Sequence, residues 1–320
     1  MLIGISLDTL KAEYLKLYCE WYFMNKWITK IYEREYKKLL ILPIALFLCA
    51  LLVIGYWQIN TGEVVSKDVT LTGGLMITVE TTEDININQV EKDISAQVGL
   101  STRIKELKSF SSGGKIGYTF EVEKTSDIDA VKSAITTHTG LSLEEGTYTI
   151  EEISSSLSQS FWRNTVQSLF LAFFFMAGVI FLYFRKTVPS GAIVLAAVSD
   201  FVCTLAIMNL IGIKLSTASV AALLMLIGYS VDSNILLSVR VLKRHDGTVA
   251  ERIMGALKTG MTMSTTTLVA LLTIYLITPS RILQQIAMVL IFGLIFDFIN
   301  TWLQNASILS WWLEKKHGKV

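Results

Sequence analysis

Residues 188–211 read VPSGAIVLAAVSDFVCTLAIMNLI, a run of almost entirely apolar side chains with one aspartate, Asp200, in its middle. At a rise of about 1.5 Å per residue, a helix of this length crosses the roughly 30 Å hydrocarbon core of a bilayer. With 52% hydrophobic residues, the whole chain is also more apolar than a soluble domain requires. This stretch therefore predicts a membrane helix within a membrane protein.

Five further stretches have the same character, so we predict a polytopic α-helical membrane protein with six transmembrane helices. The predicted spans are residues 39–59, 165–184, 188–211, 215–239, 260–277 and 282–313. Lys and Arg residues gather at one set of span ends, whereas Lys214 and Arg281 are nearly alone at the other set. By the positive-inside rule, this asymmetry predicts that both termini are cytoplasmic.

The polar stretch 60–164 is too long for a loop and has the length of a small domain. Its pattern predicts strands and helices in the order βαββαβ, at 75–79, 88–98, 102–108, 115–123, 127–138 and 147–153. Gly113 and Gly114 mark the central turn, and the polar segments 60–66 and 154–160 are expected to be mobile tethers. The order is typical of a ferredoxin-like α+β domain, which the topology places outside the cytoplasm.

The two ends of the chain complete the predicted organisation. Residues 1–38 form a cytoplasmic amphipathic segment with aromatic residues at helical spacing, and residues 314–320 form a cytoplasmic tail. An amphipathic helix of this kind lies in the lipid headgroup region, or it packs on the cytoplasmic face of a partner. Both arrangements stay open.

Three aspartates interrupt the predicted spans: Asp200, Asp232 and Asp297. A carboxylate near the bilayer centre costs about 2.5–3.5 kcal/mol, so each one asks for a function or a partner. Helical spacing puts Asp232 on one face with Gly228, and Ser230 on another face with Asn234.

We predict that an intramembrane polar centre couples protons to transport. Its candidate residues are Asp232, Asp200, Asp297, Asn234, Thr266 and Lys258. Further polar side chains in the predicted spans enlarge this centre: Asn209, Asn300 and Asn305. We expect Asp232, Asp200 and Thr266 to lie closest together. In the alternative interpretation, these groups make hydrogen bonds between helices that merely fix the packing.

Several classes of function find no support in the sequence. The net charge is +1 and there is no long basic run, which argues against nucleic acid as a partner. Cys19, Cys49 and Cys203 lack the spacing of metal ligands, and the Gly-Gly pairs are not followed by a phosphate-binding Lys-Ser/Thr. We therefore predict no enzyme, no metal site and no cofactor.

Three segments together resemble the SecF family of protein-export membrane proteins. The first, residues 67–74, reads KDVTLTGG and contains Asp68, Gly73 and Gly74. The second is the Ser-Asp pair at 199–200. The third, residues 226–235, reads LIGYSVDSNI with Gly228, Tyr229 and Ser230, and it is followed by Arg240 and by MSTTTL at 263–268.

The resemblance implies an accessory subunit of the Sec translocon that promotes protein export with a SecD-like subunit, using the proton-motive force. It implies membership of the resistance-nodulation-division superfamily, with the SecY translocon, exported protein chains and membrane lipid as further partners. The sequence resembles archaeal members more than bacterial ones, and the resemblance implies a place in the cytoplasmic membrane. In bacterial members the acid falls at the position of Ser233 instead of Asp232, and a basic residue stands at the position of Thr259.

Two other functions remain open from the sequence. One is a half-transporter of the same superfamily for a small molecule or lipid, although a domain of about 100 residues leaves little room for a substrate cleft. The other is a purely structural subunit that organises the translocon. In that case, removing the buried acids costs stability but leaves export intact.

Overall fold

The computed structural model describes residues 32, 36–81, 83–108, 115–123, 127–141, 143, 148–244, 247–278 and 280–317. The predicted turn at Gly113 and Gly114 and nearly all of the predicted N-terminal amphipathic segment lie outside these residues.

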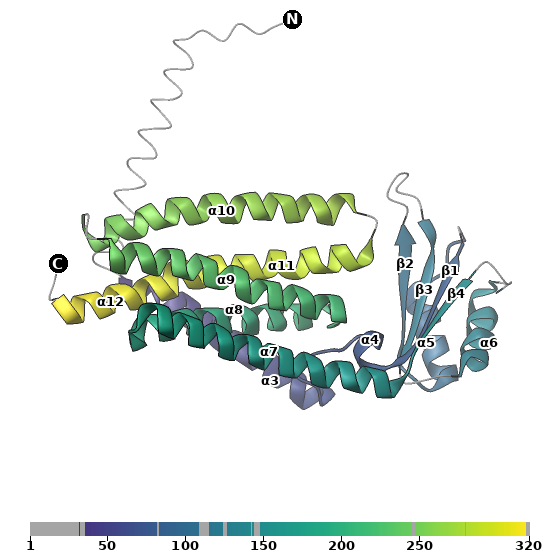
Figure 1. The fold of residues 1–320 in the computed structure, drawn as a ribbon. Helices are drawn as coiled ribbons and strands as arrows, with labels where there is room; N and C mark the ends of the chain where they lie inside the picture. Colours follow the sequence, from purple (N-terminus) through teal and green to yellow (C-terminus); the bar gives the residue numbers. More distant parts are fainter. Residues whose placement is uncertain are drawn as a thin grey trace, which may run out of the picture.

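Within the described residues, six helices are long and apolar enough to cross a membrane, as predicted (Figure 1). The first five are α3 (Ile41–Thr61), α7 (Ser155–Phe184), α8 (Thr187–Ile211), α9 (Thr217–Lys243) and α10 (Val249–Ile277). The last span consists of α11 (Arg281–Ile299), the π-helix η1 (Asn300–Asn305) and α12 (Ala306–His317). A short helix, α2 (Tyr36–Leu39), precedes α3.

Two helices begin well before the predicted spans because capping residues precede them. Ser154 caps α7 by accepting a hydrogen bond from the backbone N–H of Leu157 at 3.3 Å. Thr248 and Glu251 form a capping box at the start of α10. The segment 154–160, expected to be a mobile tether, is instead the first part of the continuous helix α7.

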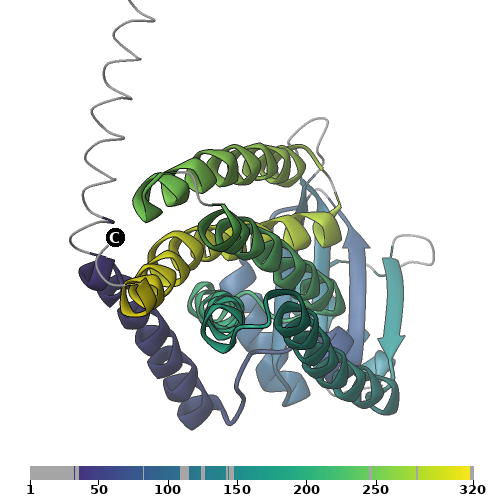
Figure 2. The same ribbon diagram turned by 60° about the vertical axis from the view of Figure 1, so that its left-hand side comes forward.

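Helices α8 and α9 form the centre of the bundle, and about half of the apolar window of each is buried. Viewed closer to the bundle axis, α3, α7, α10 and the last span surround them (Figure 2). The outer faces of α3, α7 and α10 carry large exposed apolar side chains such as Leu52, Phe170 and Leu276. An apolar exterior of this kind is suited to lipid or to another membrane helix.

The polar domain is a four-stranded antiparallel sheet in the order β2-β3-β1-β4, with helices α5 (Ile87–Val98) and α6 (Ile128–Thr139) packed beside it. The strands are β1 (Gly74–Glu80), β2 (Thr102–Lys108), β3 (Lys115–Glu123) and β4 (Tyr148–Ile153). On β1, Leu75, Ile77 and Val79 alternate into the core that the helices cover. This is the predicted βαββαβ order and the strand arrangement of a ferredoxin-like domain.

The sheet domain is attached to the bundle by direct contacts at the α8–α9 connection, residues 212–216. The backbone of Asp68 donates to Leu215 O at 2.8 Å, and Leu215 donates to Ser66 O at 2.7 Å. Arg103 of β2 donates to Gly212 O at 3.1 Å, and Lys214 forms an ion pair with Glu123 of β3. The expected tether 60–66 therefore ends in backbone hydrogen bonds to the bundle.

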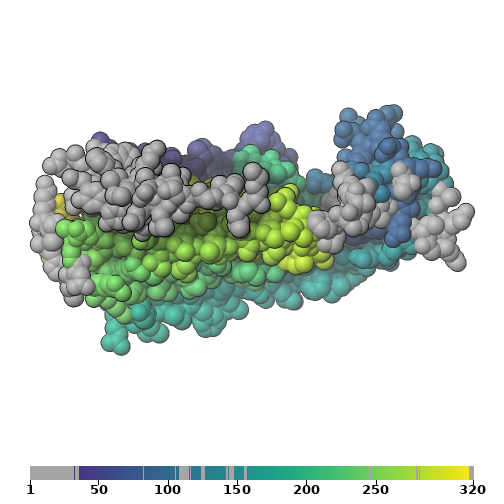
Figure 3. Space-filling model, turned by 90° about the horizontal axis from the view of Figure 1, so that it is seen from above, coloured from purple at the N-terminus to yellow at the C-terminus, as the bar shows by residue number. Residues whose placement is uncertain are grey.

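The molecule is elongated, with the sheet domain at one end (Figure 3). We call this the sheet end; it includes the α8–α9 connection. The opposite end, where α2 begins and α12 finishes, is called the terminal end.

Close helix packing at Gly260 gives a first prediction. A Cβ atom at this position would lie 2.2 Å from Cζ2 of the Trp302 ring, whereas a Cβ at Gly178 of α7 would meet nothing within 4 Å. We expect Gly260→Ala to lower the free energy of unfolding of the purified protein by about 1–3 kcal/mol, because the rigid ring must move. The control Gly178→Ala should leave it unchanged or raise it slightly. Equal stability of the two variants in denaturant titrations would contradict the packing of α10 on Trp302.

Candidate intramembrane polar site

Asp200 lies near the middle of α8 with its side chain fully buried. Ser230 of α9 donates to Asp200 Oδ2 at 2.5 Å, and Asn300 of η1 donates through Nδ2 to Asp200 Oδ1 at 2.7 Å. Both carboxyl oxygens are thereby satisfied by other helices. The carboxyl group of Asp200 thus connects three of the membrane spans.

Asp297, near the end of α11, lies beside this carboxyl and is 1% exposed. Thr301 donates to Asp297 Oδ1 at 3.0 Å, and Ser233 Oγ lies 3.0 Å from Asp297 Oδ2. Asp200 and Ser230 are also direct neighbours of the Asp297 carboxyl. We call Asp200 and Asp297 the carboxyl pair. Within the described part of the chain, no Lys or Arg forms an ion pair with either member.

A chain of amides continues from the carboxyl pair toward the terminal end. Asn234 donates to Ser230 O at 2.8 Å, and Asn305 donates to Asn234 Oδ1 at 2.7 Å. On the α8 side, Ser199 Oγ lies 3.4 Å from Gln304 Oε1. All of these side chains are buried, so the polar site extends from the carboxyl pair along the interior of the bundle.

The π-helix η1 explains how one span supplies so many inward polar groups. In a π-helix the backbone hydrogen bonds run from residue i to i+5, so residues five apart come onto nearly the same face. Asn300 and Asn305 are five apart, and both point into the polar site. π-Helical turns of this kind are frequent at functional sites.

From the sequence we expected Asp232 to lie close to Asp200, but the structure does not bring these two residues together. Asp232 is exposed on the outer face of α9 with Gly228, because it lies two residues, about 200° of helical rotation, beyond Ser230. Asn234 faces the interior with Ser230, as the predicted separation of the two faces requires. The inward acid beside Asp200 is therefore Asp297.

Three other candidate residues also lie away from the carboxyl pair. Thr266 is exposed on α10, and its hydroxyl lies 2.8 Å from Met263 O of the same helix. Lys258 is exposed near the start of α10. Asn209 lies at the sheet end, where it donates to Val64 O at 3.0 Å.

The residues of the quoted motifs have identifiable structural positions. Asp68 caps the short helix α4 (Val69–Thr72), accepting from Val69 N at 2.7 Å. Gly73 adopts φ 79°, a conformation that favours glycine, where the chain turns from α4 into β1. Tyr229 shares a hydrogen bond with Thr267 of α10, which links the two helices outside the carboxyl pair.

Sequence reasoning named Arg240 only as part of a motif and gave it no role in the site, whereas it reaches α10 from the last turn of α9. Its guanidinium donates to Thr259 Oγ1 at 2.8 Å and to Gly255 O. A cation thus does lie at the position of Thr259, but it comes from the neighbouring helix. Thr301 was missed, and Ser233 was named only as the position of the bacterial acid. The available signal is the spacing of Ser233 three residues from Ser230 and of Thr301 four residues from Asp297.

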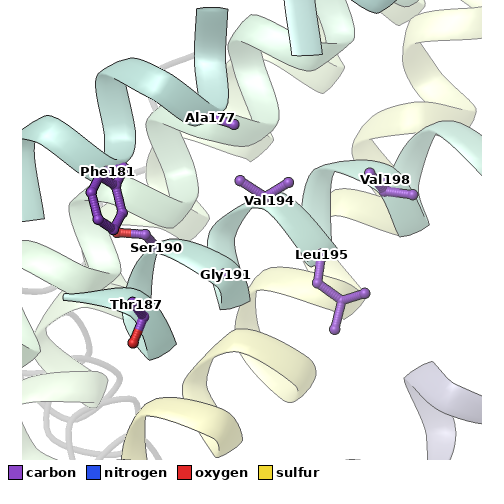
Figure 4. A pocket seen from close by; sticks show the side chains of 8 residues that line it. All are labelled: Ala177, Phe181, Thr187, Ser190, Gly191, Val194, Leu195 and Val198. Carbon is purple, nitrogen blue, oxygen red and sulfur yellow. The ribbon is translucent and has the colours of Figure 1, made fainter. Parts of the chain in front are cut away.

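An open groove between α7 and α8 lies on the outside of the bundle, apart from the polar site (Figure 4). Its walls are mostly apolar, with Phe181 on α7 and Val194 and Leu195 on α8 among the residues that line it. Such a surface is suited to an acyl chain or an apolar side chain. It offers no acid or base.

Comparison with known proteins identifies the family. Residues 132–315, more than half of the chain, match the family model described as protein export membrane protein SecD/SecF, C-terminal. The chain is 39% identical to the protein-export membrane protein SecF of Methanocaldococcus jannaschii, over 89% of this chain and 99% of that protein. It is 38% identical to the SecF of Pyrococcus furiosus, over 90% of this chain and 94% of that protein.

Solved structures agree in fold. The chain is similar to the crystal structure of SecDF from Thermus thermophilus, described as a translocon-associated membrane protein, with a TM-score of 0.68 and 16% identity. The match covers 87% of this chain but 38% of that one. A second SecDF structure, in a super-membrane-facing form, gives a TM-score of 0.56. The family model and the archaeal relatives show that the chain belongs to the SecD/SecF family of protein-export membrane proteins.

Proposed function

We propose that this protein is a SecF-type accessory subunit that, together with a SecD-type partner and the SecY translocon, promotes protein export across the cytoplasmic membrane. The relatives named for protein export support the process, and the carboxyl pair supports the use of a proton gradient. Since the chain spans 38% of the length of SecDF, a separate partner would supply the remainder.

The chemistry of the carboxyl pair suits a site that binds and releases a proton. Two adjacent carboxylates in a low-dielectric interior repel each other, and no cation among the described residues offsets their charges. The pair therefore favours a shared proton, and its protonation behaves as a property of both groups together. Loss or gain of that proton changes which oxygens of Asp200 and Asp297 accept hydrogen bonds from Ser230 and Ser233.

The contacts of the sheet domain offer a route from proton to substrate. The carboxyl pair joins α8, α9 and the last span, and the short α8–α9 connection carries Gly212 and Lys214. These two residues hold Arg103 and Glu123 of the sheet. A shift of α8 against α9 would move the domain through these contacts, without the mobile tethers expected from the sequence.

An exposed polar surface on α9 and α10 suggests where a SecD-type partner would bind. Asp232 and Gly228 on α9 and Thr262, Thr265 and Thr266 on α10 are exposed among apolar neighbours. A carboxylate facing lipid is costly at this depth. We propose that the partner covers this surface and supplies a hydrogen-bond donor or cation to Asp232.

Substitution of the carboxyl pair tests proton coupling. Asp200→Asn and Asp297→Asn preserve size and most hydrogen bonds but cannot titrate, so each variant should assemble at normal abundance and lose gradient-dependent stimulation of export. The measurement is precursor translocation into energised and uncoupled vesicles. Asp232→Asn is the comparison variant: if it alone abolishes stimulation, the coupling site lies at the partner surface. Normal stimulation by both carboxyl-pair variants would favour a structural subunit.

A second test addresses the side of the membrane on which the sheet domain lies. Glu151 of β4 and Lys316 of α12 are both exposed and lie at opposite ends of the molecule. In intact cells, an impermeant thiol reagent should label Glu151→Cys and should reach Lys316→Cys only after the membrane is opened. The opposite pattern would invert the proposed topology.

A third test addresses the partner surface. Met225 on α9 is 53% exposed and lies about two helical turns from Asp232 on the same face, whereas Phe174 is 64% exposed on α7, which packs more on α8 than on α9. A photo-crosslinking amino acid at position 225 should capture a SecD-type subunit, and the same probe at position 174 should not. Capture at 174 and not at 225, read by immunoblot, would place the partner on α7.

A further inference from the structure

Buried polar groups continue on the terminal side of the carboxyl pair beyond the hydrogen-bonded amides. Ser238 lies four residues after Asn234 on the same face of α9, and Ser307 lies three residues after Gln304 on the last span. Both serine side chains are fully buried.

Several of the buried polar atoms on this side of the carboxyl pair have no hydrogen-bond partner among the described residues. They are the hydroxyl oxygens of Ser238 and Ser307, Nε2 of Gln304, and Oδ1 of Asn305 and Asn300. Three of these atoms belong to amide side chains that use their other end for a hydrogen bond within the site. We call the set formed by Asn234, Ser238, Asn300, Gln304, Asn305 and Ser307 the polar column.

The opposite side of the carboxyl pair has the reverse character. Along α9 toward the sheet end, Ser230 is followed by Leu226, Leu223 and Ala222, and all three are buried. They belong to one apolar cluster with Met208 of α8 and with Leu290 and Leu294 of α11. We call this cluster the apolar seal.

The two sides of the carboxyl pair differ in whether they can hold internal water. Buried polar atoms that lack protein partners are satisfied by internal water when several of them lie along one path. Closely packed leucine and methionine side chains offer water no hydrogen bond and keep it out. On the terminal side of the carboxyl pair, water therefore finds polar partners as far as Ser238 and Ser307, beyond which Val241 and Leu309 belong to a further buried apolar cluster. Through the apolar seal on the sheet side it finds none.

We propose that the polar column is the inner part of a hydrated half-channel that leads from the carboxyl pair toward the terminal end, while the apolar seal closes the pair to the sheet end. In this conformation a proton leaves a carboxyl oxygen for the adjacent water and emerges at the terminal end as hydronium, leaving a carboxylate. The reverse transfer restores the carboxyl. The structure thus corresponds to the state of the bundle that exchanges protons on the terminal side.

The two sides can be compared with one matched pair of variants on α9. Ser238 and Ala222 are both fully buried, and each lies about two helical turns from Ser230, in opposite directions. Cysteine is close in size to both residues. Cys19, Cys49 and Cys203 would first be replaced by Ala in the full chain, and a small water-soluble methanethiosulfonate applied to membranes with either side accessible.

We expect Ser238→Cys to react from the terminal side at least about tenfold faster than Ala222→Cys from either side, because a thiol in apolar surroundings forms little thiolate. Ser307→Cys is a second variant on the column, so one misfolded protein does not decide the result. Each variant must elute as a single species in gel filtration. Equal rates for the column and seal variants overturn the proposal, as does faster labelling from the sheet side.

This inference rests on the carboxyl pair of the proposed function but is tested separately from it. Thiol labelling reports water access whether or not export needs the proton. A labelled column with unaffected export in the Asp297→Asn protein would retain the half-channel and reject the coupling. Loss of export stimulation in the Asp297→Asn protein, together with an unlabelled column, would retain the coupling and reject the half-channel.

Discussion

The arrangement of the bundle depends on the requirement that a carboxyl group in hydrocarbon be satisfied by the protein. Lipid offers no hydrogen bonds, so Asp200 is tolerated in the middle of α8 because Ser230 and Asn300 come to it from two other spans. This requirement places α9 and the last span against α8. Helices α8 and α9 are the two most buried spans of the described bundle. The outer helices then pack around a centre whose polar contacts are already specified.

The sequence predicted the architecture well because its signals are strong and local. Spans of sufficient apolar length gave the six helices, and alternation with turn signals gave the βαββαβ order of the domain. Helix starts were less well predicted, since Ser154 and Thr248 cap helices whose first turns are polar and leave the membrane-length pattern unchanged. A hydropathy window does not detect such extensions.

The candidate site was predicted in part. Helical spacing correctly separated the face of Ser230 and Asn234 from the face of Asp232, but it could not say which face points inward. Both choices are compatible with one sequence, because an exposed carboxylate in a membrane helix can be covered by another chain. Asp297 was a candidate but was not expected to be the acid closest to Asp200, since this proximity depends on how two spans distant in sequence pack together.

The departures from the bacterial sequence pattern acquire a spatial explanation. Ser233 stands where bacterial members have an acid, and its hydroxyl lies beside the Asp297 carboxyl from the last span. Thr259 stands where they have a base, and it receives the guanidinium of Arg240. Acid and base are thus present at both places but come from different helices. A position-by-position comparison with the bacterial sequences would have recorded the loss of one acid and one base.

The π-helix also determines the orientation of everything that follows it in the chain. In an α-helix, residues five apart differ by about 140° around the axis, so Asn300 and Asn305 could not both face inward. If residues 300–305 formed α-helical hydrogen bonds instead, with no residue deleted, α12 would be rotated by about 100° relative to α11. Trp311 and the Lys315 side chain stacked over its ring would turn with it. The hydrogen-bond pattern of η1, and not the length of the span in ångströms, therefore sets the angular phase of the C-terminal helix.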